Sequence, residues 1–156
     1  MVNGKPFAPI EVEDFHIYKN SYELCKYINK LNYLIIVVTN QPDIANKKNT
    51  LNNITLMHDE LKRKIPCIKK IYLCPHNNED KCNCRKPKTG LFLEAKNEFN
   101  IDLSESYLIG DRNSDIEAGQ LLGLKKIFFL NRGYKEKLPA KPYIEIKSLL
   151  DIYNYL

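Results

Sequence analysis

The sequence is short of several features that would place it in other classes of protein. None of its apolar runs approaches the ~20 residues that a bilayer-spanning helix needs. Its N-terminal residues lack the basic and apolar segments of a secretory signal peptide. There is no internal repeat, no low-complexity stretch and no basic helix face with interleaved aromatic residues. We therefore expect neither a membrane protein, an exported protein, a repeat architecture nor a nucleic-acid-binding module.

Composition and charge fit one globular domain spanning residues 1–156. The net charge is +5, and the 24 lysine and arginine residues are spread along the chain. This charge is compatible with an ordinary solvated surface or with a site for phosphate-bearing molecules. The cysteines number five, which is odd, and most of them fall in one short segment. That pattern favours a reducing, cytoplasmic location over a disulfide framework.

Hydrophobic periodicity predicts alternating strands and helices. Residues 33–38 form a continuous apolar run that is typical of a strand buried on both faces. Further strands are predicted at 68–73, 106–109 and 126–130, with a weaker one at 143–146. Helices are predicted at 21–31, 51–65, 90–99 and 113–122, and a terminal one from Ser148. This order predicts an α/β fold with a mostly parallel sheet between helical layers, and a ligand crevice beyond the carboxyl ends of the strands.

The most distinctive segment follows the second predicted strand. Cys74, His76, Cys82 and Cys84 form a C-x-H-x5-C-x-C pattern within eleven residues. Three thiolates and one imidazole are the ligand set of a closed, tetrahedral zinc site, which is structural because no coordination position remains open. Free thiols in a flexible loop, or a Cys82–Cys84 disulfide, are the less favoured alternatives.

Two further polar clusters follow predicted strands. Thr39 and Asn40 come after the first strand, where a hydroxyl and backbone N–H groups can hold phosphate oxygens or simply end a strand in a turn. Asp111 follows Gly110 at the end of the third strand, and Asp115 lies four residues later. These carboxylates suit Mg²⁺, which prefers oxygen ligands, but they equally favour the N-terminus of the next helix.

The zinc loop ends in a basic pair, Arg85 and Lys86. Two cations held next to a rigid metal loop are well placed to neutralise charge on a transferring phosphoryl group. The plainer alternative is a solvated basic pair.

Taken together, these motifs resemble the haloacid-dehalogenase-like (HAD) phosphatases, over nearly the whole chain. The resemblance is to the zinc-containing branch that includes D,D-heptose 1,7-bisphosphate phosphatase and histidinol-phosphatase. The segments VVTNQPDIA, CRKPKTG and GDRNSD are similar to the second, third and fourth motifs of that branch, and the cysteine–histidine loop resembles its zinc loop.

The resemblance implies a Rossmann-like three-layer sandwich without a large cap domain, and a Mg²⁺-dependent phosphatase acting on a small sugar phosphate through an aspartyl-phosphate. Thr39 and Asn40 would bind the transferred phosphate, and Arg85 and Lys86 would stabilise it. Asp111 would bind Mg²⁺, with Asp115 a secondary candidate. The complete protein is expected to be a monomer, with neither nucleic acid nor membrane as a partner. The chain departs from the branch after its second motif, at Pro42, Asp43, Asn46 and Lys47, which affects the predicted substrate contacts.

A larger departure concerns the first motif of the family, a strand ending in Asp-x-Asp that carries the nucleophile and the general acid–base. No two aspartates in this chain are separated by one residue. Without that nucleophile we expect no turnover from the 156 residues alone. The missing strand would also lie at the centre of the sheet, so we expect a truncated N-terminus, with a non-catalytic phosphate-binding or interaction module as the alternative.

Overall fold

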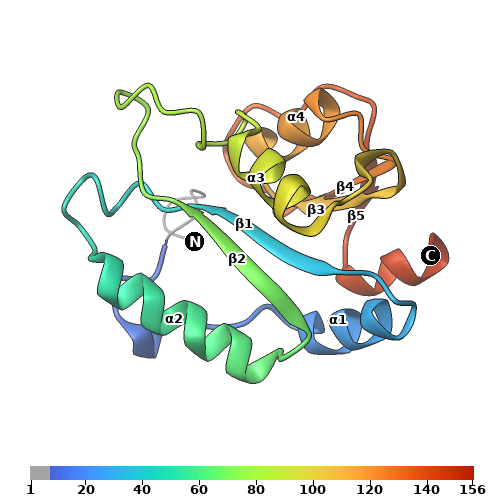
Figure 1. Cartoon of the computed structure of the whole chain (residues 1–156), viewed down its shortest axis with the longest axis horizontal. Helices are drawn as coiled ribbons and strands as arrows, with labels where there is room; N and C mark the ends of the chain where they lie inside the picture. Colours follow the sequence, from blue (N-terminus) through green and yellow to red (C-terminus); the bar gives the residue numbers. More distant parts are fainter. Residues whose placement is uncertain (1–7) are drawn as a thin grey trace. The chain divides into compact units, whose positions relative to one another are not determined.

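The computed structural model describes residues 8–156, which form two compact units, Ala8–Cys82 and Asn83–Leu156 (Figure 1). Within each unit, strands alternate with helices and all strand pairings are parallel. The α/β class predicted from the periodicity is therefore confirmed. A single domain over 1–156 stays a prediction. No helix in the described part of the chain is long and apolar enough to cross a membrane.

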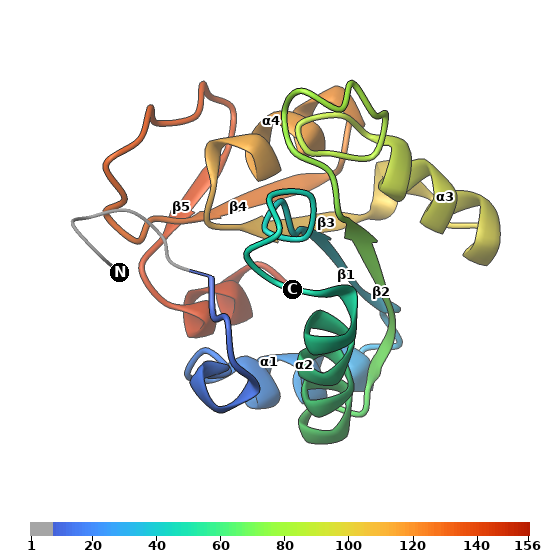
Figure 2. The ribbon, with the colours of Figure 1, turned by 90° about the vertical axis from the view of Figure 1, so that its left-hand side faces the viewer.

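In the unit Ala8–Cys82, two parallel strands are joined through a helix (Figure 2). Strand β1 (Ile35–Asn40) pairs with β2 (Ile68–Cys74) in a register that sets Asn40 opposite Cys74. The connecting helix α2 (Leu51–Lys64) begins at Thr50, whose side chain accepts a hydrogen bond from the Asn53 N–H. The 3-10 helix η1 (Val12–Asp14) and helix α1 (Ser21–Lys30) precede β1. The core of this unit is made of buried apolar side chains from α1, from α2 and its C-terminal end, and from β2: Leu24, Ile54, Met57, Ile65, Ile68 and Tyr72.

Strand β1 differs from its prediction in two ways. It begins at Ile35 and ends at Asn40, so Thr39 and Asn40 are its last two residues and do not follow it. Every residue of β1 is half-buried, so the prediction of a strand buried on both faces is wrong. The physical reason is that β1 ends its sheet, with β2 as its one strand partner within residues 8–156.

The unit Asn83–Leu156 contains a three-stranded parallel sheet in the order β3-β4-β5. These strands are Tyr107–Gly110, Lys126–Leu130 and Ile144–Ile146. Helix α3 (Gly90–Phe99) and the 3-10 helix η2 (Leu103–Glu105) precede β3, and helix α4 (Asn113–Leu121) connects β3 to β4. The central strand β4 is the apolar one, and its residues Ile127 to Leu130 are all buried. Ile116 of α4 packs with Leu108, Ile127 and Phe129 in this core.

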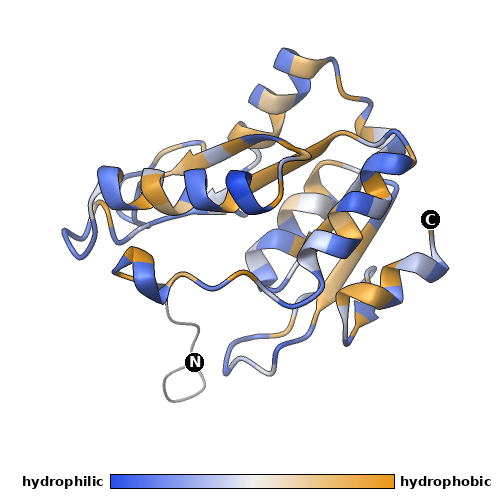
Figure 3. Cartoon of the chain, turned by 90° about the horizontal axis from the view of Figure 1, so that it is seen from below, coloured by the Kyte–Doolittle hydropathy of each residue, from blue (hydrophilic) through white to orange (hydrophobic). Residues whose placement is uncertain are grey.

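The predicted elements agree with the structure to within about two residues, as helix and strand ends usually do. Hydrophilic and hydrophobic residues both occur along the helices, as expected for helices that lie partly against a core and partly against solvent (Figure 3). The terminal helix predicted from Ser148 is a 3-10 helix, η3 (Leu149–Asn154), capped by the Ser148 side chain. The described strands form two sheets, with β1 and β3 each at the end of one.

Candidate functional site

Cys74, His76, Cys82 and Cys84 come together in one cluster, with their ligand atoms all within 4.8 Å of one another. The Sγ of Cys74 lies 3.8 Å from the Sγ of Cys82 and 3.6 Å from Nδ1 of His76. Bond lengths of about 2.3 Å for Zn–S and 2.0 Å for Zn–N in a tetrahedron require edges of about 3.8 Å and 3.6 Å. The donor set and its spacing therefore fit zinc, as the sequence predicts.

Local backbone hydrogen bonds hold this loop. Cys74 is the last residue of β2 and is fully buried, so the first ligand sits on the sheet itself. The Gln41 N–H donates to the Cys74 carbonyl (2.8 Å), and the Ala45 N–H donates to the Pro75 carbonyl (3.2 Å). Further along, the Asn77 N–H donates to the Asp80 carboxylate (2.7 Å), forming a tight turn between the ligands. The start of the zinc loop is thus fastened to the segment that follows Thr39 and Asn40.

Thr39 and Asn40 lie at the carboxyl end of β1, where the sequence places a phosphate site. The Thr39 hydroxyl accepts a hydrogen bond from the Gln41 side-chain amide (3.2 Å). After these residues the chain makes a compact turn, in which the N–H groups of Lys48 and Asn49 both donate to the Asp43 carbonyl. A hydroxyl, an amide and a tight turn at a strand end suit phosphate oxygens, and the role of both residues stays a prediction.

Lys86 and Asp115 form a nearly buried ion pair in the second unit. Lys86 Nζ lies 2.7 Å from Asp115 Oδ1, and the two side chains are only 12% and 11% exposed. The other oxygen, Oδ2, accepts the backbone N–H of Arg112 (3.0 Å) at the start of α4. Both carboxylate oxygens of Asp115 therefore already have protein partners, and the carboxylate holds the ammonium group of Lys86 in place. Arg85, the residue before Lys86, is half-buried.

Gly110 is a glycine because Asp115 lies against it. A Cβ at position 110 would come within 2.3 Å of the Asp115 Cβ and 2.8 Å of Oδ2. We predict that Gly110→Ala costs about 1–3 kcal/mol of the free energy of unfolding, the usual range for overpacking. Urea denaturation measures this cost. Gly123→Ala is the comparison variant, because an added Cβ there meets nothing within 4 Å and the variant reports only the cost of a positive φ, about 1–2 kcal/mol. If Gly110→Ala proved as stable as the wild type, the contact would be easily relieved.

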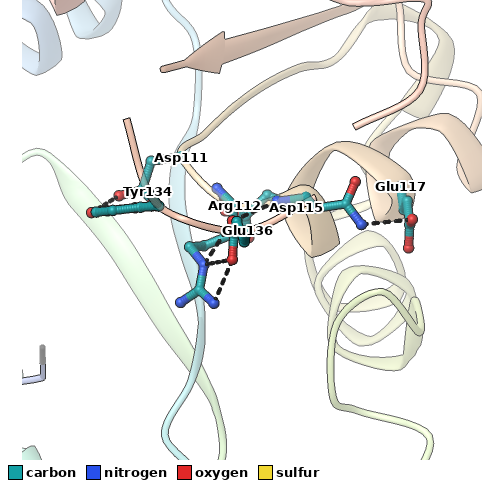
Figure 4. Close-up of polar contacts among 7 residues, drawn as sticks. Asp111, Arg112, Asp115, Glu117, Tyr134 and Glu136 are labelled. Carbon is teal, nitrogen blue, oxygen red and sulfur yellow. Dashed lines mark hydrogen bonds and ion pairs between the residues drawn. The ribbon is translucent and has the colours of Figure 1, made fainter. Parts of the chain in front are cut away.

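Asp111 lies one residue beyond β3, and its partner comes from a distant part of the chain. The Tyr134 hydroxyl donates to Asp111 Oδ2 at 2.8 Å (Figure 4). Burial raises the pKa of the Asp111 carboxyl, and this hydrogen bond acts in the opposite direction. Burial and the neighbouring carboxylate raise the pKa of Tyr134 to about 12, so its hydroxyl remains a donor at neutral pH.

A second contact joins the same two segments. The Arg112 guanidinium faces the Glu136 carboxylate, with Nε 2.9 Å and Nη2 2.8 Å from Oε2 (Figure 4). Tyr134 and Glu136 are functional candidates that the sequence analysis missed. They follow β4 and carry no motif of their own, so no local pattern in the sequence marks them.

Known proteins resemble this chain in sequence and in structure. A model of the HAD-hydrolase-like family matches residues 83–151. D-glycero-alpha-D-manno-heptose-1,7-bisphosphate 7-phosphatase of Campylobacter jejuni is 35% identical over 93% of this chain and 84% of its own length. D-glycero-beta-D-manno-heptose-1,7-bisphosphate 7-phosphatase of Neisseria meningitidis is 33% identical over 93% of this chain and 83% of its own.

Structure comparison agrees on the fold. The crystal structure of D,D-heptose 1,7-bisphosphate phosphatase from B. bronchiseptica, complexed with magnesium and phosphate, matches with a TM-score of 0.82 and 19% identity. That match covers 93% of this chain and 86% of the crystallised one. The cysteine–histidine cluster, the strand-end residues and the sequence identity all agree. The chain belongs to the HAD-like hydrolases, among relatives named as heptose-1,7-bisphosphate 7-phosphatases.

Proposed function

We propose that this chain provides the zinc-, magnesium- and phosphate-binding parts of a phosphatase that releases the 7-phosphate of D-glycero-D-manno-heptose 1,7-bisphosphate. The observation that carries the proposal is identity above 30% to relatives named for this activity over more than nine-tenths of the chain. These relatives are named for both anomers of the sugar, so the proposal extends to the alpha and the beta substrate. A cytoplasmic location belongs to the proposal, because thiolate ligands require a reducing compartment.

Each predicted residue has a role that its surroundings support. Thr39 and Asn40 bind phosphate oxygens at the end of β1, and Arg85 and Lys86 offset the charge of the phosphoryl group. Asp111 offers carboxylate oxygens for Mg²⁺, which supplies electrostatic stabilisation of the phosphate when bound. A magnesium role for Asp115 stays the weaker prediction, because Lys86 and Arg112 already occupy its oxygens.

The proposed reaction takes its nucleophile from an Asp-x-Asp pair, and the 156 residues contain no such pair. In the proposed chemistry an aspartate carboxylate attacks phosphorus, the bond from phosphorus to the C7 oxygen breaks, and a second aspartate donates a proton to that oxygen. Water then hydrolyses the acyl phosphate and regenerates the carboxylate. Cys74, His76, Cys82 and Cys84 would hold zinc with four protein ligands, which would leave it no open position for a part in these steps.

The proposal is tested on the native protein purified from its source cells, alongside the 156-residue chain. We expect phosphate release from heptose bisphosphate by the native protein with Mg²⁺, and none from the chain alone. If the intact mass of the native protein exceeds that of this chain, and the added residues contain Asp-x-Asp, those residues account for the difference in activity. Within the active protein, Lys86→Met is expected to lower kcat by roughly 10²–10³. Lys88→Met, an exposed lysine two residues on, serves as the control. Failure of the native protein to hydrolyse any phosphomonoester would refute the proposal.

The absence of Asp-x-Asp favours one alternative, a phosphate-binding module that does not turn over. In that case the native mass equals that of this chain, and inorganic phosphate or a sugar phosphate raises its melting temperature. No such shift at millimolar phosphate would count against this alternative.

A further inference from the structure

Asp111 is held by a side chain from a distant part of the chain. Its carboxylate projects from the end of a parallel strand, where a short side chain has several rotamers available. Among the described residues, its one hydrogen bond is from the Tyr134 hydroxyl to Oδ2, at 2.8 Å. Oδ1 accepts none. The contact therefore distinguishes the two oxygens of one carboxylate, engaging Oδ2 and leaving Oδ1 available to a ligand.

Tyr134 can impose this orientation only if its own position is fixed, and contacts on both sides of it do this. Before it, the Gly133 N–H donates to the Asn131 side chain (3.0 Å), in a turn where Gly133 has a φ of +67°. After it, Glu136 is bound by the Arg112 guanidinium and accepts the Asn113 N–H at 3.3 Å. The loop is thus tied to the start of α4, immediately after Asp111.

The aromatic ring is restrained as well. The guanidinium carbon of Arg112 lies 5.7 Å from the centre of the Tyr134 ring, and that of Arg132 lies 6.0 Å from it. A guanidinium at this distance from a ring is attracted to the electron-rich face of the ring. Together with the ion pair these two contacts hold the phenol in one direction, toward Asp111 (Figure 4).

We propose that Tyr134 is a positioning residue, which fixes Asp111 so that Oδ1 faces a bound Mg²⁺. The proposal rests on the magnesium role that the proposed function gives to Asp111. A carboxylate that ligates one cation through one oxygen usually has its other oxygen held by a hydrogen-bond donor. Here that donor comes from the loop after β4, and Glu136 and Arg112 keep the loop in place.

Mg²⁺ titration of the full chain by isothermal calorimetry tests this. Tyr134→Phe keeps the ring and removes only the donor, so we expect Mg²⁺ affinity to fall roughly 10-fold, the lower end of outer-shell effects on metal sites. Glu136→Ala releases the loop by another route and is expected to weaken Mg²⁺ binding by a smaller factor. Tyr143→Phe is the matched control, because Tyr143 packs its ring on Phe129 and takes no part in this site. The Mg²⁺ affinity of Tyr143→Phe should stay within about twofold of that of the wild type, because substitutions away from a site usually have small effects.

Asp111→Asn separates this proposal from the proposed function. We expect it to abolish Mg²⁺ binding. If it does so while Tyr134→Phe and Glu136→Ala bind Mg²⁺ as tightly as the wild type, the positioning role is overturned and the magnesium site stands. If the wild type binds no Mg²⁺, or Asp111→Asn binds it normally, both fail. Circular dichroism confirms that each variant is folded, so that a loss of affinity is not a loss of structure.

Discussion

Cys74→Ser is expected to release the zinc ion and to destabilise the chain by about 4 kcal/mol, the scale on which loss of a structural metal acts. For a chain of this size, that lowers the melting temperature by roughly 8–16 °C. Cys74 is the fully buried ligand and the last residue of β2, so its loss opens the cluster at its anchor on the sheet. A serine hydroxyl is a poor zinc ligand and would be buried at the same place.

Metal analysis by mass spectrometry and thermal denaturation check this result. The wild type should contain one zinc per chain and Cys74→Ser almost none. Cys67→Ser is the matched control, since Cys67 is a half-buried thiol outside the cluster. It should keep its zinc. A Cys74→Ser variant with a full complement of zinc, or a wild type purified without any, would show that the cluster does not hold this metal.

Asp115→Ala is expected to cost about 3–5 kcal/mol, the range for breaking a buried ion pair by removing one partner. The Lys86 ammonium would be left 12% exposed without its carboxylate, and the Arg112 N–H would lose the acceptor that begins α4. Removing both charges leaves no buried ion, so the double variant Lys86→Met/Asp115→Ala is expected to be more stable than Asp115→Ala alone. Urea denaturation of the two single variants and the double variant measures the coupling.

An exposed pair provides the comparison. Lys125 and Glu105 are 2.5 Å apart, but their side chains are 40% and 65% exposed. Solvent screens such a pair, so Glu105→Ala is expected to cost at most about 1 kcal/mol. Equal losses of stability in Glu105→Ala and Asp115→Ala would show that burial does not set the cost of breaking these ion pairs.

The parts of the site that depend on neighbouring residues were predictable from the sequence. The zinc ligands lie within eleven residues, so their spacing alone limits how far apart they can be. Helix and strand positions also followed from hydrophobic periodicity, because each element has to bury an apolar face. The family motifs single out Thr39 and Asp111, and the structure places Thr39 next to the last residue of β1 and Asp111 one residue beyond β3. Arg85 and Lys86 directly follow the last zinc ligand, Cys84.

Other features depended on contacts between distant residues. Tyr134 reaches Asp111 across 23 residues, and Arg112 reaches Glu136 across 24. No local pattern specifies such pairs. The burial of β1 was predicted wrongly for the same reason, since an apolar run does not reveal how many strands will pair with it. The close approach of Gly110 to Asp115 became clear only in three dimensions.

The sequence by itself determined the α/β class, the zinc ligand set, the family resemblance and the absence of Asp-x-Asp from these residues. Each of these depends on residue types and on short spacings, and both can be read directly from the sequence. Only the tertiary structure decided that Asp115 holds Lys86, that Tyr134 engages one oxygen of Asp111, and that β1 is an end strand. These arise from packing and loop closure over long separations, where many pairings are compatible with the same local pattern.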